Sequence, residues 1–183
     1  MIFSLTLFAC FFTNCFSVYY CEMDKEKCDS LDNSQTISSS IYSGDYCGCT
    51  GNQVDITVST STINKYSFYE NLKIKSVTFT STSTVDLYDK AFYGCKNLQE
   101  IDFASSEISR IGISTFEGCI QLTTISAFPS RLTTIDDCAF VNNSKLESTV
   151  NFNQHLELIG DNAFQGTQIT FDWGNLPSSL TSI

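Results

Sequence analysis

Five phenylalanines occupy every twenty-fourth position of the chain from Phe68 onward, and this regularity constrains the fold more than any other feature. They are Phe68, Phe92, Phe116, Phe140 and Phe164. Other apolar positions keep the same interval, and a second such set is Leu87, Ile111, Ile135, Ile159 and Ile183. A period of about 20 to 50 residues is typical of repeat architectures, in which stacked units bury a shared core. The sequence therefore predicts a solenoid.

One repeat, TFEGCIQLTTISAFPSRLTTIDDC from Thr115 to Cys138, indicates the form of a single coil. Its LTTISA segment alternates loosely and is rich in strand-forming residues, so we expect one parallel strand per coil. A second apolar pair, Leu132 and Ile135, should return along the opposite wall. The segment with the pattern A-F-x-x-C should form a short helical turn, with its phenylalanine in the core. We predict a mainly β solenoid of about five coils, at 65–88, 89–112, 113–136, 137–160 and 161–183.

The pattern L-x-x-I-x-x-F-P-S-x-L-x-x-I-x-x-x-A-F-x-x-C, present as LTTISAFPSRLTTIDDCAF from Leu122 to Phe140, resembles a known repeat. It is similar to the leucine-rich repeat of BspA-like surface proteins, the Treponema pallidum type. The segments LQEIDF, RIGISTFEGC and LPSSLTSI carry parts of the same pattern, so the resemblance covers about residues 65–183. It implies a leucine-rich repeat solenoid and a role in adhesion to host or neighbouring-cell proteins, or in coaggregation.

The composition argues against several classes of function. The formal charge is −10, with 20 acidic and 10 basic residues, so a basic footprint for DNA or RNA is absent. The single histidine, His155, lies at a position outside the apolar ladders. The sequence has no G-x-S-x-G elbow, H-E-x-x-H pair, glycine-rich phosphate loop or D-x-D-x-D-G series. We therefore expect no enzyme, metal or cofactor, with a secreted hydrolase as the enzymatic alternative.

Three aspartates come shortly before the phenylalanine turns, and they could serve as carboxylate ligands or as caps. They are Asp136, Asp137 and Asp161. An acidic side chain at the start of a turn usually accepts hydrogen bonds from free backbone donors. We expect these aspartates to be caps.

Residues 1–17, MIFSLTLFACFFTNCFS, are apolar and carry no charged side chain. The run is too short for a membrane span and fits a secretory signal that is cut after Ser17. A buried N-terminal strand is the alternative. No later apolar stretch is long enough to span a membrane, so we predict a secreted or cell-surface chain without a membrane span of its own.

Residues 18–52 differ in composition and hold four cysteines, Cys21, Cys28, Cys47 and Cys49. Because a solenoid exposes an apolar end, we expect this segment to cap a leucine-rich repeat region at 53–183. Four cysteines in a short secreted segment indicate two disulfides, for which three pairings are possible. A zinc site is the alternative, although the spacings C-x6-C and C-x-C do not fit a zinc finger.

Two cysteines within the coils, Cys95 and Cys119, occupy equivalent positions. We expect both to be free and buried, since a free cysteine packs as a small apolar residue. A disulfide between them is the alternative. Asn71 and Asn143 take the same position in other coils, where an asparagine should bond to its own backbone.

The triplet Asn142–Ser144 is a sequon for N-linked glycosylation. In a secreted chain Asn142 could carry a glycan. The alternative is an unused turn triplet, because a sequon alone does not establish occupancy.

The sequence stops at Ile183, the last of the apolar positions that recur at the repeat interval, and no capping segment follows. An uncapped coil leaves its apolar stack exposed. We expect a truncated product or a fragment of a longer repeat protein, with dimerisation through the open end as the alternative.

The strand segments should present a polar outer face. Its predicted residues are Lys75, Ser76, Thr78, Gln99, Glu100, Asp102, Thr123, Thr124, Ser126, Glu147 and Ser148, with Phe171 and Asp172 in the last coil. The face becomes acidic at Glu100 and Asp102. We predict that an extracellular protein or cell-surface ligand binds there, with a plain solvated sheet as the alternative. The sequence thus favours a secreted binding or adhesion module, and a non-functional remnant of a repeat family is the competing hypothesis.

Overall fold

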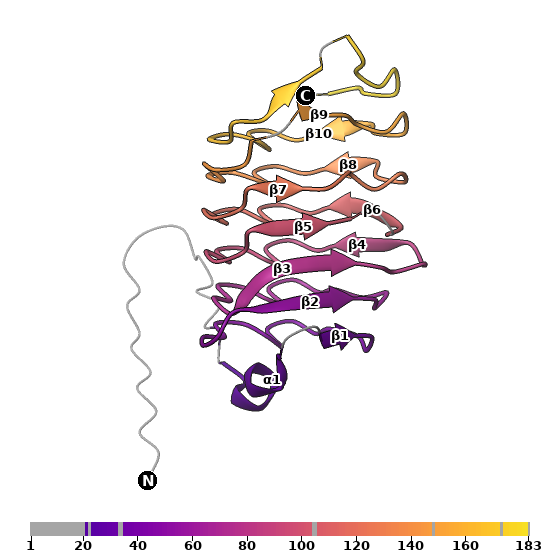
Figure 1. Ribbon diagram of the computed structural model, residues 1–183. Coiled ribbons are helices and arrows are strands. Elements are labelled where there is room, and N and C mark those ends of the chain that lie inside the picture. The colour runs from indigo at the N-terminus through magenta and orange to yellow at the C-terminus, as the bar shows by residue number, and fades with distance from the viewer. Residues whose placement is uncertain are drawn as a thin grey trace, which may run out of the picture.

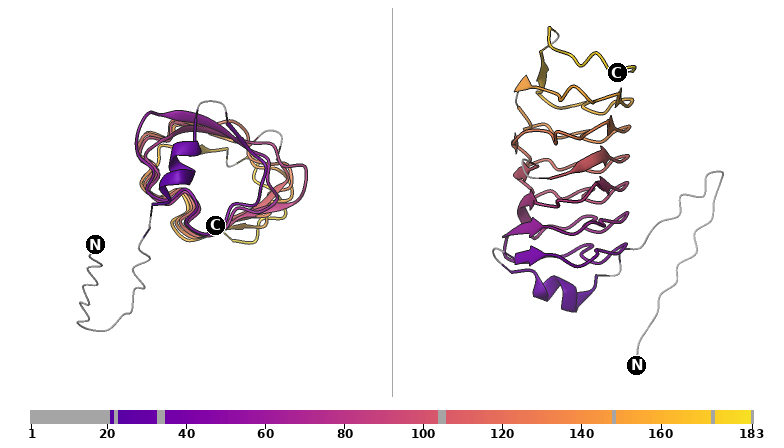
Figure 2. Two further views of the ribbon diagram at one scale, coloured as in Figure 1. Left: turned by 90° about the horizontal axis from the view of Figure 1, so that it is seen from below. Right: turned by 90° about the vertical axis from the view of Figure 1, so that its right-hand side faces the viewer.

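The computed structural model describes residues 21, 23–32, 35–103, 106–147, 149–172 and 174–182. Within these residues the chain winds into a parallel β-solenoid whose coils stack along one axis (Figures 1 and 2). The repeat fold predicted from the phenylalanine period is confirmed. The predicted signal at residues 1–17 lies outside the described residues, as do Ser148 and Ile183.

Two walls of the solenoid are parallel sheets. The first wall has the strand order β1-β2-β3-β5-β7, with β1 at Gln35–Ile37, β2 at Val54–Val58, β3 at Ile74–Phe79, β5 at Glu100–Asp102 and β7 at Thr124–Ile125. The second wall has the order β10-β8-β6-β4, with β4 at Val85–Leu87, β6 at Ile108–Ile111, β8 at Thr134–Ile135 and β10 at Leu158–Ile159. Further along the axis, β9 at Thr149–Val150 pairs with β11 at Thr170–Phe171.

Most coils therefore carry two short strands, where the sequence predicts one. The extra strand arises in the returning apolar segment, which is extended and lies in register with its equivalents. Ile135 of β8 pairs with Ile111 of β6 on one side and with Ile159 of β10 on the other. Because stacked extended segments lie about 4.8 Å apart, their backbone groups form a second ladder of hydrogen bonds.

A third side of the solenoid consists of consecutive turns, and we call it the turn wall (residues 42–49, 64–71, 88–95, 112–119, 136–143 and 160–167). The predicted short helical turn is replaced there by overlapping turns. In one coil, the N–H groups of Ala91, Tyr93 and Cys95 each donate to the carbonyl three residues before them in the chain, at 3.2–3.3 Å. The intervening N–H groups, those of Lys90, Phe92 and Gly94, donate to backbone carbonyls of the next coil at 2.8–2.9 Å.

Positive φ angles make this alternation possible. Lys90 has φ +57° and Gly94 has φ +68°. Each is the third residue of a four-residue β-turn, in which the N–H of the fourth residue donates to the carbonyl of the first. A positive φ at that position is the mark of a type II turn and is incompatible with a continuous helix. The backbone of the turn wall therefore bonds alternately within a coil and between coils.

The core contains two aromatic ladders. In the first, neighbouring rings have centroids 4.7–5.3 Å apart in the order Tyr46, Phe68, Phe92, Phe116, Phe140 and Phe164. In the second, the spacing is 5.3–6.2 Å in the order Phe79, Phe103, Phe128, Phe152 and Phe171. The phenylalanine period predicts only the first ladder. Edge-to-face contacts join the two, for example between Phe79 and Phe92 at 87°.

The N-terminal segment closes one end of the stack (Figure 1). Its helix α1 (Lys25–Ser30) begins after Asp24, whose carboxylate accepts the Lys27 N–H at 3.0 Å. Two disulfides tie the segment together, as predicted, and the structure selects one pairing among three: Cys21 with Cys47 and Cys28 with Cys49. Strand β1 also lies in this segment and pairs with β2, so the sheet begins inside the predicted cap.

The prediction that Phe171 faces outward is wrong. Phe171 pairs with Val150, whereas the repeat period would pair it with Glu147. These two candidate partners are an odd number of residues apart, and such a change of register turns a strand residue to the other face. Phe171 consequently packs against the core, as do the half-buried side chains of Phe164, Ile169, Leu176 and Leu180 in the same coil.

Candidate binding surfaces

The outer face of the first wall brings together the predicted polar residues of β3, β5 and β7. Parallel register places Ser76, Glu100 and Thr124 in one column across the three strands. A second column contains Thr78 and Asp102. Because side chains alternate along a strand, these columns lie beside the inward-facing Val77, Ile101 and Ile125.

The predicted residues of this face differ in exposure. Six are exposed: Lys75, Glu100, Thr123, Thr124, Ser126 and Glu147. Four others and the late residue Asp172 are half-buried: Ser76, Thr78, Gln99 and Asp102. Ser148 lies outside the described residues. The coils therefore place eleven of these side chains at or near the surface, in the rows that the repeat predicts.

Hydroxyl groups hold two carboxylates of this face in position. The Ser76 hydroxyl donates to Asp55 Oδ1 at 2.7 Å, and the Ser126 hydroxyl donates to Asp102 Oδ1 at 2.8 Å. Both bonds join neighbouring coils, so they fix the carboxylates relative to the sheet.

Charged residues also join the second wall to the turn wall. Arg110 of β6 pairs with Asp136 and has Nη2 3.6 Å from Asp89 Oδ1. Burial raises the pKa of Asp136 above its ordinary value, although Arg110 opposes this. Burial acts in the same direction on Asp89, but the hydrogen bond and charge of Lys65 bring the pKa of Asp89 below its ordinary value.

Of the three aspartates expected to act as caps, Asp137 accepts a hydrogen bond from a backbone N–H group. Asp137 Oδ1 accepts the backbone N–H of Asp161 at 2.9 Å. This bond joins equivalent positions of neighbouring coils, so it caps a donor of the next coil and not of its own turn. Among the residues that the structure describes, no three His, Cys, Asp or Glu side chains form a group that could hold a metal ion.

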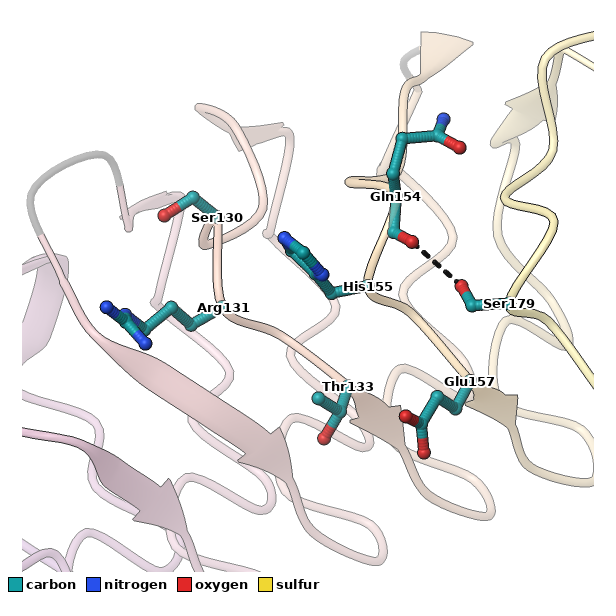
Figure 3. Close-up of a pocket in the computed structure, with 7 residues that line it drawn as sticks. All are labelled: Ser130, Arg131, Thr133, Gln154, His155, Glu157 and Ser179. Atoms are coloured by element: carbon teal, nitrogen blue, oxygen red, sulfur yellow. Dashed lines mark hydrogen bonds between the residues drawn. The ribbon is translucent and has the colours of Figure 1, made fainter.

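A polar groove crosses three coils beside the second wall, along the segments that lead into β8 and β10 (Figure 3). Its volume is about 540 Å³, and it is lined by Ser130, Arg131, Thr133, Gln154, His155, Glu157 and Ser179. The Ser179 hydroxyl donates to the Gln154 carbonyl at 2.9 Å, as Figure 3 shows. Arg131 forms an ion pair with Glu107 at the side of the groove. The arrangement can hydrogen-bond a polar ligand.

The sequence analysis places His155 outside the apolar ladders but does not predict the groove. The structure confirms that His155 is exposed, and its backbone N–H donates to Asn153 Oδ1 at 2.7 Å. Arg131, His155 and Ser179 follow one another at the repeat period, so stacking brings them side by side. The repeat period applied to polar positions would have revealed this row.

The buried cysteines of the coils are free, as predicted. Cys95 and Cys119 are inaccessible, and their thiols donate to the carbonyls of Phe68 at 3.1 Å and Phe92 at 3.3 Å. Burial, followed by the neighbouring Cys119, raises the pKa of Cys95 well above its ordinary value. Because the thiolate is the reactive form, Cys95 is chemically inert in this position.

The two asparagines at the same position behave differently. Asn71 Nδ2 donates to the Tyr46 carbonyl at 2.7 Å, and Asn71 Oδ1 accepts from its own turn, as predicted. Asn143 is equally buried, but its Oδ1 and Nδ2 have no partner within the described part of the chain. The neighbouring Asn142, the glycosylation candidate, is exposed on the turn wall with φ +62°.

Comparison with known families decides what kind of repeat this is. Six copies of the BspA-type leucine-rich repeat region match residues 36–170. The chain belongs to the BspA-type leucine-rich repeat family. The family match begins in β1, so in this BspA-type chain the repeats reach into the segment that holds the disulfides.

Three bacterial structures resemble this BspA-type chain. A leucine-rich repeat protein from Eubacterium ventriosum has a TM-score of 0.61 at 24% identity, over 75% of this chain and 36% of its own. One from Bacteroides ovatus has a TM-score of 0.48 at 30% identity, over 54% and 24%. A leucine-rich cell surface protein from Faecalibacterium prausnitzii has a TM-score of 0.46 at 19% identity, over 80% and 49%.

The E. ventriosum structure supports the fold of this BspA-type chain. The matches extend over 24% to 49% of the three solved chains, so this chain covers less than half of each of them. No curated protein matches it. Within the described residues, no helix has the length and apolar character needed to cross a membrane.

Proposed function

We propose that this BspA-type chain is a secreted or cell-surface module that binds proteins of host or neighbouring cells through the outer face of its first wall. The observation that carries the proposal is the row of surface carboxylates and hydroxyls on β3, β5 and β7. Glu100 is exposed, and Asp102 is held by the Ser126 hydroxyl. Repeat solenoids commonly use such extended faces to bind other proteins.

Two features support a location outside the cell. Residues 1–17 have the length and apolar character of a secretory signal. The two disulfides near the N-terminus are of the kind that persists in oxidising compartments. Because a secretory signal delivers a chain to such a compartment, the two features support each other.

Binding can be tested with beads coated with residues 18–183 and incubated on cultured epithelial or bacterial cells. We expect the beads to be retained, and protease treatment of the cells beforehand should remove the retention. Glu100→Lys combined with Asp102→Lys should weaken it several-fold, because charge reversal on a binding face disrupts complementary contacts. A matched variant that reverses Glu26 and Asp32, exposed residues of the N-terminal segment, should bind normally.

The outcomes separate the parts of the proposal. Full retention of the Glu100 and Asp102 variant would remove the first wall from consideration. Absence of retention on every cell type tested would contradict adhesion itself. Secretion is tested separately by expressing the chain with its own N-terminus in a secreting host. Mature protein that begins at Val18 would support the signal, whereas intact cytosolic protein that begins at Met1 would contradict it.

A further inference from the structure

The surface tyrosines of this chain gather on one side of the solenoid. The sequence has eight tyrosines; Tyr19 and Tyr20 lie outside the described residues, and Tyr46 belongs to the first aromatic ladder. All five others lie on the turn wall: Tyr42, Tyr66, Tyr69, Tyr88 and Tyr93. Tyr42 and Tyr88 are 64% and 38% exposed, which is high for large aromatic side chains. The sequence has no tyrosine after Tyr93, so the cluster is confined to the N-terminal half of the wall.

The central tyrosines of this cluster are held rigidly. Tyr69 and Tyr93 stack with their centroids 5.0 Å apart and their planes 6° apart. Tyr66 meets Tyr69 edge-on at 5.7 Å and 62°. A tyrosine side chain has only two χ angles and offers a large amphipathic contact area at low entropic cost. Pre-organised, half-buried aromatic side chains of this kind are enriched at the energetic centres of protein interfaces.

Carboxylates flank this aromatic cluster. Burial raises the pKa of both Tyr69 and Tyr93, and negative charge adds to this effect, first from Glu70 at Tyr69 and from Glu117 at Tyr93. Glu117 occupies the position equivalent to Tyr93 in the next coil, and the Glu70 side chain lies over Gly94. The phenols therefore remain neutral at physiological pH, and the charge that surrounds them is negative.

The positive charges of this part of the wall are already engaged. Lys65 is paired with Asp89 at 2.6 Å. Lys90 Nζ lies 5.6 Å from the centroid of the Tyr93 ring, within the distance of a cation–π contact. Lys90 thus shows that the Tyr93 ring is placed to receive a cation. The formal charge of −10 for the whole chain favours the approach of a basic partner.

We propose that the tyrosine strip, formed by Tyr66, Tyr69, Tyr93, Glu70 and Glu117, binds an arginine- or lysine-bearing segment of a partner protein. The rings contact the cationic side chains, and the two carboxylates pair with their charge. A guanidinium group suits the strip best, because it can stack on an aromatic ring while it bonds to a carboxylate. The tyrosine strip is separate from the first wall, and this proposal does not depend on whether the first wall binds a partner.

The test uses the full disulfide-bonded chain and a short fluorescent peptide of alternating glycine and arginine. Glycine–glutamate and glycine–serine peptides of equal length serve as controls. We expect binding of the arginine peptide alone. Tyr69→Ala combined with Tyr93→Ala should lower its affinity about tenfold, since each cation–π contact contributes a few-fold to an order of magnitude. Tyr69→Phe combined with Tyr93→Phe keeps both rings and should stay within about twofold of the wild type.

Two further variants locate the binding. Lys90→Ala frees the Tyr93 ring and should tighten binding of the arginine peptide about twofold. Glu100→Gln combined with Asp102→Asn, on the first wall, should leave it unchanged. Circular dichroism and the unfolding midpoint establish that each variant is folded, and the phenylalanine variant provides the test if the alanine variant is not. Peptide binding that survives a failed cell-adhesion assay would support the strip while contradicting the proposed function.

Three results would overturn the tyrosine strip as a site for basic segments. The first is a wild type that does not bind the arginine peptide. The second is a folded alanine variant with wild-type affinity, or a folded phenylalanine variant that loses binding. The third is binding of a neutral oligosaccharide in place of the peptide, which would assign the rings to sugar recognition.

Discussion

Phe92 and Phe116 stack with their ring centroids 5.2 Å apart and their planes 17° apart, although a full repeat period separates them in the chain. Neither side chain has any accessible surface. The edge of each also meets the second ladder, Phe92 at Phe79 and Phe116 at Phe103. Each ring is therefore enclosed by aromatic side chains of adjacent coils, and these contacts join one coil to the next.

Truncation of a central ring should be far more damaging than truncation of a terminal one. Phe116→Ala removes a fully buried ring and should lower the free energy of unfolding by about 3–5 kcal/mol. Phe164→Ala, at the half-buried end of the same ladder, should cost about 1–2 kcal/mol. Urea denaturation followed by circular dichroism measures both. Equal losses would show that the ladder has no buried centre.

The two equivalent asparagines provide a matched pair. Asn71→Ala removes hydrogen bonds to Tyr46, Lys73 and Ile74 and should cost about 2–3 kcal/mol. Asn143→Ala removes a buried amide that has no partner among the described residues, so it should be close to neutral or stabilising. Thermal unfolding of the two variants tests the difference. A larger loss at Asn143 than at Asn71 would contradict the hydrogen bonding seen here.

The disulfide pairing gives a direct chemical prediction. Proteolysis without reduction, followed by mass spectrometry, should yield peptides that link Cys21 to Cys47 and Cys28 to Cys49. Replacing Cys28 and Cys49 by serine should cost about 3 kcal/mol, as expected for a bond that closes a loop of this length. Peptides that link Cys21 to Cys28 or Cys47 to Cys49 would rule out the arrangement of the N-terminal cap.

The two aspartates beside Arg110 should have opposite pH dependence. The lowered pKa of Asp89 contributes stability that is present at neutral pH and is lost as the pH falls below about 4. The raised pKa of Asp136 has the reverse effect, so its contribution is present in acid and declines as the pH rises above about 4. The free energy of unfolding is measured from acid to neutral pH. The wild type should be more stable than Asp89→Asn at neutral pH, and the two values should converge in acid. Relative to Asp136→Asn, the wild type should weaken as the pH rises, and parallel curves would refute both assignments.

The repeat period predicts the stacking because it depends on spacing alone. Phe92 and Phe116 fall on the period, and so do Ile111 and Ile135 of the second wall. The second ladder is harder to see, since the interval from Phe103 to Phe128 exceeds the period and the interval from Phe152 to Phe171 falls short of it. Such irregular intervals appear as a ladder only once the paths of the connecting loops are known.

Other features depend on geometry that spacing does not encode. The disulfide pairing depends on where α1 and the first turn of the turn wall place four Cα atoms, so the sequence leaves three pairings open. The outward prediction for Phe171 fails because the last coil pairs this residue with Val150, which is off the repeat period. The repeat period alone would have indicated that Tyr69 stacks on Tyr93, since one period separates them. The edge-on contact of Tyr66 with Tyr69 depends on the path of the turn, which the period does not give.

The most direct test of the stacked core is a nuclear Overhauser experiment on protein labelled only in its phenylalanine rings. Cross-peaks should join Phe68 to Phe92, Phe92 to Phe116 and Phe116 to Phe140, whose centroids lie 4.7, 5.2 and 5.3 Å apart. Weaker cross-peaks should join Phe92 to Phe79 and Phe116 to Phe103. The solenoid described here is wrong if rings one repeat period apart show no cross-peaks. It is also wrong if a dissolved paramagnetic probe broadens the signals of these rings as it would those of exposed rings.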